Sequence, residues 1–387
     1  MHLCPNGPGC ESVRVKIAPF GIEQWMNEFE TRARYNLAET CVESVTVSEL
    51  LDLTGSRATL FDELLPIPLT YGPIEGSDRL REAVAARYEH QSRGNVLITH
   101  GAIGANHLVH LTLVEPGDRV VSVLPTYQQH YAIPASIGAD VAILRLREQN
   151  AWLPDLDELA ALVAGGAKLV AINNPNNPTG SLMDEAFLRE VVAICERAGA
   201  WLLCDEVYRG IDQSEPGTTV SVADLYERGI STGSMSKAFS MAGVRLGWVV
   251  AARELIEELT IHRDYTTISV GRVDDLLASL ALEHADAILA RNRALVRGNC
   301  ETLAQWVEAQ PGLGWVRPRG GTTALLRYEA SAPSRELCVG LLEETGVMLT
   351  PGSVMDMEGY LRIGYANNPD VLRAGLPLLA GFLAARS

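Results

Sequence analysis

The sequence has no apolar run of the ~18 residues that a transmembrane helix needs. Its N-terminal stretch, MHLCPNGPGCESVRVKIAPF, also lacks the apolar core of a secretory signal. We therefore expect a soluble cytoplasmic protein that has no membrane partner.

Basic residues are also scarce. The chain has 32 Lys and Arg against 48 Asp and Glu, which gives a formal net charge of −16. Because binding to nucleic-acid phosphates needs a basic surface, this balance argues against a nucleic-acid partner. The charge of a small substrate stays open, since a local site can oppose the overall charge.

Paired cysteines are missing as well. None of the seven cysteines forms a C-x-x-C pair, and their number is odd: Cys4, Cys10, Cys41, Cys195, Cys204, Cys300 and Cys338. We expect reduced thiols in a cytosol and no metal site, including at Cys4 and Cys10 in the Pro/Gly-rich start.

The chain does have a regular alternation of short apolar runs and helical periodicity. The runs are typical of buried strands, at 95–100, 119–124, 168–173 and 200–204, with helices expected at 102–114, from about 127, and at 184–198. This order predicts an α/β fold, a mainly parallel sheet sandwiched by helices.

The 387 residues allow more than one domain. We expect an N-terminal arm over 1–45, a large α/β domain over 46–272 and a smaller α+β domain over 273–387. The arm should pack on the small domain. That domain should begin with a long helical stretch to about Val307 and contain a strand near 322–328.

Polar motifs follow the predicted strands, where open α/β sheets bind their ligands. THGAIG (99–104) can aim the amides of Gly101, Ala102 and Ile103 at an anion, or can simply be a tight connection. NNPNNPTG (173–180) and DEVY (205–208) could likewise be a polar turn and a helix cap. SMSK (234–237), followed by Arg245, suggests an amine beside a phosphate, although a surface lysine would also fit.

Taken together, NNPTG, DEVY and S-x-S-K-x(7)-R-x-G resemble the fold-type I pyridoxal-phosphate enzymes of the aspartate aminotransferase superfamily. The resemblance runs from about Tyr71 to Arg362. It implies a pyridoxal 5′-phosphate cofactor and a large domain of the kind these transferases share.

The resemblance also implies roles for single residues. Lys237 would form the Schiff base and move the Cα proton, and Asp205 would pair with the pyridine nitrogen. Tyr208 and Asn177 would donate to the phenolic oxygen of the cofactor, with Asn177 also near the substrate. The phosphate would be held by Gly101, Ala102, Ile103, Ser234, Ser236 and Arg245.

Two tyrosines complete the implied cofactor site. Tyr127 matches the aromatic residue that stacks on the ring, with a core aromatic as the alternative. Tyr71 matches a tyrosine that reaches the phosphate across a dimer interface, which implies a homodimer with shared active sites. His100, just before the phosphate-binding turn, is expected to be buried and hydrogen-bonded.

Arg362 in LRIG matches the arginine that binds the substrate α-carboxylate, so an α-amino acid is the expected substrate. Glu39 lies where the family has a Gly-rich segment over the substrate. Its carboxylate could pair with a cationic side chain, or could be a helix cap or a solvated charge.

The cofactor leaves the reaction open. An aminotransferase, which would also use a 2-oxo acid, is the first hypothesis. The run 263–269 (RDYTTIS) resembles capreomycidine synthase-like enzymes, which cyclise hydroxylated arginine, and makes elimination, cyclisation or oxidation of a cationic amino acid the alternative. A catalytically silent sensor is the third, which the intact Lys237, Asp205 and Arg362 argue against.

Overall fold

The computed structural model describes residues 17–386. Cys4 and Cys10, for which we expect no metal or disulfide role, lie outside them. Within the described part of the chain, no cluster of His, Cys, Asp or Glu side chains could hold a metal ion. None of the helices described there is long and apolar enough to cross a membrane.

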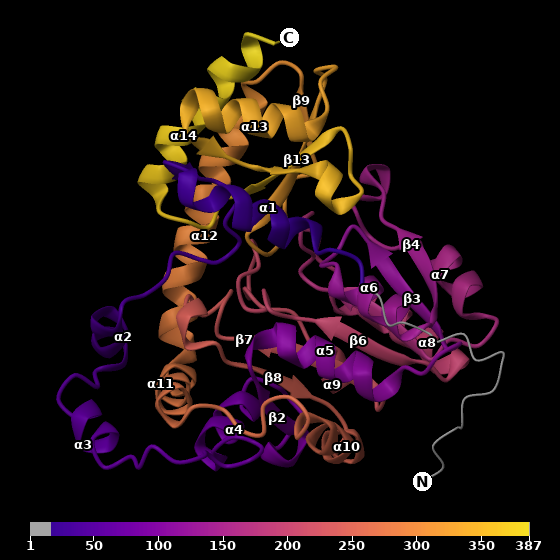
Figure 1. Ribbon diagram of the computed structural model, residues 1–387, viewed down its shortest axis with the longest axis vertical. Helices are drawn as coiled ribbons and strands as arrows, with labels where there is room; N and C mark the ends of the chain where they lie inside the picture. Colours follow the sequence, from indigo (N-terminus) through magenta and orange to yellow (C-terminus); the bar gives the residue numbers. More distant parts are fainter. Residues whose placement is uncertain (1–16, 387) are drawn as a thin grey trace, which may run out of the picture.

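A seven-stranded sheet forms the centre of the molecule (Figure 1). In order across the sheet, its strands are β2 (Val96–Thr99), β8 (Gly247–Val250), β7 (Gly229–Ser234), β6 (Trp201–Asp205), β5 (Leu169–Asn173), β3 (Arg119–Leu124) and β4 (Asp140–Arg145). Only β8 runs against its neighbours. The prediction of a mainly parallel sheet is confirmed, but three of its strands, β4, β7 and β8, were not among the predicted ones.

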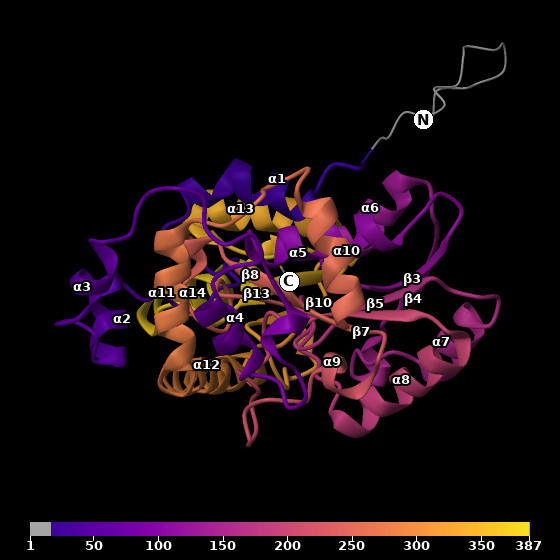
Figure 2. The same ribbon diagram turned by 90° about the horizontal axis from the view of Figure 1, so that it is seen from below.

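Helices cover both faces of this sheet, as predicted. The helices around it are α4 (Asp78–Ala85), α5 (Gly101–Leu113), α6 (Gln129–Ile137), α7 (Leu156–Val163), α8 (Glu185–Ala198), α9 (Val222–Leu225) and α10 (Arg253–Arg263). Short 3₁₀ turns are η2 (Arg93–Asn95), η3 (Glu148–Asn150) and η4 (Ala242–Val244). Figure 2 shows α5, α6 and α10 on one side of the strands and α7, α8 and α9 on the other.

Local signals explain where these elements begin and end. Every residue of β5 is buried, as expected for a parallel strand covered on both faces. Helix α8 begins where the Asp184 side chain accepts a hydrogen bond from the Phe187 amide, and it ends at Gly199 with a left-handed φ of 66°. These are the usual N-cap and C-cap residues for such a helix.

A second sheet is built from the C-terminal part of the chain. Its strands are β12 (Thr350–Pro351), β13 (Tyr360–Gly364), β10 (Thr323–Tyr328) and β9 (Leu313–Trp315), with α13 (Ser334–Thr345), α14 (Pro369–Ala384) and η5 (Gly352–Met355) beside them. The predicted strand near 322–328 is β10. The predicted domain boundaries at 45/46 and 272/273 stay predictions.

The long helical stretch expected after residue 273 is two helices, α11 (Arg272–Glu283) and α12 (Ala285–Glu308). The break falls at His284, whose φ of −116° and ψ of 27° are not helical. Composition did not reveal it, because the residues on both sides are strong helix formers. In Figure 1, α12 runs from the level of α11 up to the second sheet.

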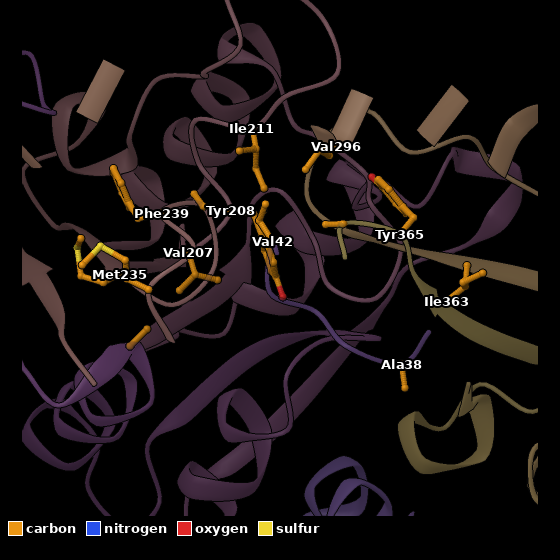
Figure 3. Packing of buried hydrophobic residues seen from close by; sticks show 14 of the residues in the cluster. Ala38, Val42, Val207, Tyr208, Ile211, Met235, Phe239, Val296, Ile363 and Tyr365 are labelled. Atoms are coloured by element: carbon orange, nitrogen blue, oxygen red, sulfur yellow. The ribbon is translucent and has the colours of Figure 1, made fainter. Parts of the chain in front are cut away.

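The N-terminal segment crosses between the two sheets. It comprises α1 (Gly21–Phe29), η1 (Glu30–Arg32), β1 (Tyr35–Asn36), α2 (Val47–Thr54) and α3 (Leu60–Leu64), of which α2 and α3 stand at one edge (Figures 1 and 2). Strand β1 pairs in parallel with β11 (Val347–Met348), beside the second sheet. Figure 3 shows Ala38 and Val42 near Tyr208 and Ile363 in the main buried cluster.

Candidate active site

One cavity of about 440 Å³ lies at the carboxyl ends of the central strands, under the N-terminal segment. Of the site residues predicted from the sequence, all but Tyr71 line it: Glu39, Gly101, Ala102, Ile103, Tyr127, Asn177, Asp205, Tyr208, Ser234, Ser236, Lys237, Arg245 and Arg362. Residues distant in the chain therefore meet in one place.

Lys237 follows β7, and its Nζ donates to Thr40 Oγ1 at 2.6 Å and lies 3.4 Å from Cys41 Sγ. Burial lowers the pKa of Lys237, but the acidic groups of Cys41, Tyr208 and Glu39 outweigh burial and raise it overall. Thr40 and Cys41 were not predicted as neighbours of the lysine, and only their place next to Glu39 could have indicated them.

Asp205 ends β6 and is 5% exposed. Its Oδ2 accepts from Asn106 Nδ2 at 2.9 Å, and Asn106 Oδ1 accepts from Thr232 Oγ1 at 2.7 Å. His130 Nε2 lies 3.7 Å from the same carboxylate oxygen. Asn106, which holds this carboxylate, and His130, which lies beside it, were missed, since nothing in the sequence shows that α5 and α6 face β6.

Asn177 and Arg362 are joined directly, because Arg362 Nη1 donates to Asn177 Oδ1 at 3.2 Å. Arg362 Nη2 donates to Ala38 O at 3.1 Å and to Thr350 Oγ1 at 3.0 Å, all neutral acceptors. The guanidinium is 2% exposed, and its Nε has no partner among the described residues. A buried cation without a carboxylate is suited to binding an anion.

The turn before α5 fits a phosphate group. Gly101 begins the helix with a φ of +67°, which favours glycine, and the first amides of the helix lack intrahelical acceptors. Arg245 Nη1 donates to Ala242 O at 2.9 Å and lies 3.5 Å from Ser236 Oγ. Hydroxyls, amides and a guanidinium therefore meet at one end of the cavity.

Tyr127 and Tyr208 lie on the walls. Tyr127 OH donates to Glu23 Oε1 at 2.9 Å, and its ring centroid is 4.7 Å from that of Phe20. Burial and then the Glu23 charge raise the pKa of Tyr127. Tyr208 is 2% exposed, and burial raises the pKa of its phenol.

Glu39 is not a helix cap, and its pairing with a cationic side chain stays a prediction. Its Oε1 accepts from the amides of Thr40 at 2.7 Å and Cys41 at 2.8 Å, so the carboxylate closes its own turn. It also lines the cavity. Burial raises the pKa of Glu39, but the Lys237 charge and the two amides lower it overall.

Tyr71 and His100 do not lie with the other predicted residues in the cavity. Tyr71 is 76% exposed and outside the cavity of its own chain. The expectation of a buried His100 is wrong, because this side chain is exposed where α5 begins. Partial burial and the charges of Arg263 and Arg245 lower its pKa.

The residues of this cavity fit pyridoxal 5′-phosphate. The amine of Lys237 suits its aldehyde, and the buried carboxylate of Asp205 suits its ring nitrogen. The side chains of Asn177 and Tyr208 suit its phenolic oxygen, and the turn before α5 suits its phosphate. When bound, this cofactor stabilises negative charge at the substrate Cα. The fold and the site therefore define a pyridoxal-phosphate-dependent enzyme.

Comparison with known proteins agrees. Residues 68–374 match the family model for aminotransferase class I and II, and the chain belongs to this family. It is 34% identical to capreomycidine synthase from Streptomyces vinaceus over 97% of this chain and 95% of that protein.

Two solved structures are also similar. A PLP-dependent aminotransferase from Streptococcus suis 89-1591 is 41% identical, with a TM-score of 0.93 over 96% of this chain and 99% of that one. The PLP-dependent cyclase OrfR is 29% identical, with a TM-score of 0.88 over 96% and 98%. The protein is thus an enzyme of this family, and both transamination and a cyclase-like reaction fit.

Proposed function

We propose that this enzyme transfers the amino group of an α-amino acid to a 2-oxo acid. The observation that carries the proposal is the arrangement of Lys237, the amine, and Arg362, the unpaired buried guanidinium, in one cavity. Arg362 binds the α-carboxylate of the substrate, which places its Cα near Lys237. Lys237 holds the cofactor covalently and, once released, moves the Cα proton.

The other polar residues hold the cofactor in the orientation this chemistry needs. The Asp205 carboxylate, fixed by Asn106, keeps the ring nitrogen protonated. Asn177 and Tyr208 donate to the phenolic oxygen, and Tyr127 stacks on the ring. Gly101, Ala102, Ile103, Ser234, Ser236 and Arg245 bind the phosphate.

A homodimer with shared active sites is part of the proposal. Tyr71 lies on an exposed apolar strip with Leu69, Ile74, Tyr265 and Ile268, which are 91%, 44%, 89% and 41% exposed. The two segments of this strip adjoin, since Arg272 Nη1 donates to Pro68 O at 3.2 Å. A second copy that covers the strip would bring Tyr71 to the phosphate end of its neighbour. The five cysteines described are free, which fits the cytoplasm we propose.

Single-turnover chemistry tests the reaction. The holoenzyme is mixed with one amino acid at a time and no 2-oxo acid. Transamination should yield one equivalent of 2-oxo acid per active site and convert the cofactor to its amine form. Continued release of 2-oxo acid, with ammonia or with oxygen uptake, would contradict the proposal.

Cyclisation of a hydroxylated arginine is the second candidate. The near full-length similarity to capreomycidine synthase favours it, as does the similarity to the cyclase OrfR. In the same mixing experiment with a β-hydroxylated arginine, mass spectrometry would show a product lighter by one water. That product, formed over many turnovers with the cofactor unchanged, would replace transamination as the assigned reaction.

A further inference from the structure

Helix α1 and the turn η1 place two carboxylates along the cavity. Glu23 and Glu30 are two helical turns apart, so they project from the same side of the segment, and both line the cavity that holds Lys237. The other side of α1 is buried through Trp25 and Phe29. The segment therefore has one face fixed in the core and one acidic face directed to the site.

Glu39 joins these two from the following loop. The pKa of Glu30 is raised, first by partial burial and then by the negative charges of Glu39 and Glu23. All three carboxylates belong to residues that line the same cavity. We call Glu23, Glu30 and Glu39 the acidic rim.

Within residues 17–386, the acidic rim lies near cationic groups without being paired with them, since the Lys237 charge lowers the pKa of Glu39 from a distance beyond that of an ion pair. The Glu23 side chain accepts a hydrogen bond from Tyr127 OH at 2.9 Å, and Glu39 Oε1 accepts from the backbone amides of Thr40 and Cys41, so both have neutral donors. None of the three carboxylates forms an ion pair within that part of the chain, whereas Glu28, on the same helix, pairs with Arg335 at 3.0 Å. The negative charge of the rim is left for a ligand.

Arg362 supplies the independent second observation. Its guanidinium is 2% exposed, lines the same cavity, and has an Nε without a partner in the described chain. The cavity therefore presents a guanidinium with one free donor and neutral acceptors only, as well as carboxylates whose hydrogen-bond donors are neutral. A ligand that satisfies both carries a carboxylate and, at another point, a positive charge.

We propose that the acidic rim is a binding site for the cationic side chain, guanidinium or ammonium, of the amino acid whose α-carboxylate binds Arg362. This inference rests on the proposed function and adds the class of substrate. Glu23 and Glu30 are then residues that select the substrate, and Glu39 both selects it and closes its own turn. A cation held by carboxylates from two segments gains charge-assisted hydrogen bonds that a neutral side chain lacks.

Matched ligands test this without relying on turnover. The absorbance of the bound cofactor is titrated with L-arginine, L-lysine and L-citrulline, which has the length of arginine and a neutral end. We expect a dissociation constant at least about tenfold lower for a cationic ligand than for citrulline. The tighter of arginine and lysine identifies guanidinium or ammonium. Equal constants for all three would overturn the inference.

Variants locate the effect. Glu30→Gln should weaken binding of the cationic ligand about threefold, and Glu23→Gln with Glu30→Gln about tenfold, with citrulline unchanged. Glu28→Gln, the matched control, should change neither. Glu39 is left intact because its carboxylate also holds the amides of Thr40 and Cys41.

Thermal unfolding and the dissociation constant for citrulline distinguish a loss of selectivity from a loss of folding or of the proposed function. The thermal unfolding midpoint of the double variant should match that of the parent, which separates lost selectivity from lost folding. Equal weakening of citrulline and arginine in a folded double variant would refute the acidic rim while leaving the proposed function standing. If no amino acid changes the absorbance, the proposed function fails, and this inference fails with it.

Discussion

The two sides of the cavity are built differently. On the sheet side, Asp205 is buried at the end of β6 and is held by Asn106, while Lys237, shortly after β7, is half-buried and is held by Thr40. On the α1 side, Glu23 is half-buried and Glu30 exposed, with few partners. Groups that several hydrogen bonds hold in place are preorganised for catalysis. Charges with few partners contribute mainly to which ligand binds. The comparison separates reaction from selectivity within one cavity.

The largest effect should come from removing the amine on the sheet side. Lys237→Ala should lower kcat by about 10³-fold or more, because the covalent attachment and the proton carrier are lost together. Steady-state kinetics measures this, and borohydride reduction with peptide mapping should find the cofactor on Lys237. The chain has only three lysines, Lys16, Lys168 and Lys237. Lys168→Ala is the control that should keep its activity.

The same variant also tests the shared sites. Mixing Lys237→Ala chains with Tyr71→Ala chains should restore activity, because one site of each mixed dimer would combine an intact Lys237 with an intact Tyr71. No recovery after verified exchange of subunits would show that Tyr71 does not act across an interface.

An intermediate effect should come from Arg362, which both sides of the cavity hold through Asn177 and Ala38. Arg362→Lys keeps the charge but loses the planar fork, so KM should rise about tenfold while kcat falls less. Arg373→Lys, an exposed pair with Asp370, serves as the control. A KM that stays constant would mean that the substrate carboxylate binds elsewhere.

The smallest effect should come from the hydrogen bond that ties the two sides together. Tyr127→Phe keeps the ring and removes the donor to Glu23. We expect a two- to threefold change in the dissociation constant for a cationic amino acid, from an interaction worth about 1 kcal/mol. Tyr131→Phe, in the adjoining helix α6 but outside the cavity, should change nothing. A hundredfold weaker binding of the cationic amino acid by Tyr127→Phe would contradict the contrast between the two sides of the cavity, because the α1 side would then be needed for more than selectivity.

The sequence predicted the sheet side well for a physical reason. Groups such as Asp205 and Lys237 follow buried strands within a few residues, and parallel strands bring their carboxyl ends to one edge. The positions of these residues just after buried strands therefore already imply that their side chains lie close together. Asn106, which donates to Asp205, and His130, which lies near it, come from helices, where sequence position does not reveal the direction of a side chain.

The α1 side could not be predicted in the same way. An amphipathic pattern shows that α1 buries Trp25 and Phe29, but where its polar face points depends on docking. Glu23 and Glu30 were therefore missed, and only Glu39, next to a known position, was found. His100 was misjudged similarly, since a residue that follows a buried strand need not be buried.

The pairing of β1 with β11 and the crossing of α1 over the cavity have a consequence for how this enzyme could change. All three carboxylates of the acidic rim belong to one short stretch near the start of the chain, and none belongs to the sheet. A single recombination crossover after that stretch would exchange the whole rim and keep Lys237, the lysine of our proposal. New substrate preferences are thus open to this enzyme through one inherited segment, without a search through scattered substitutions.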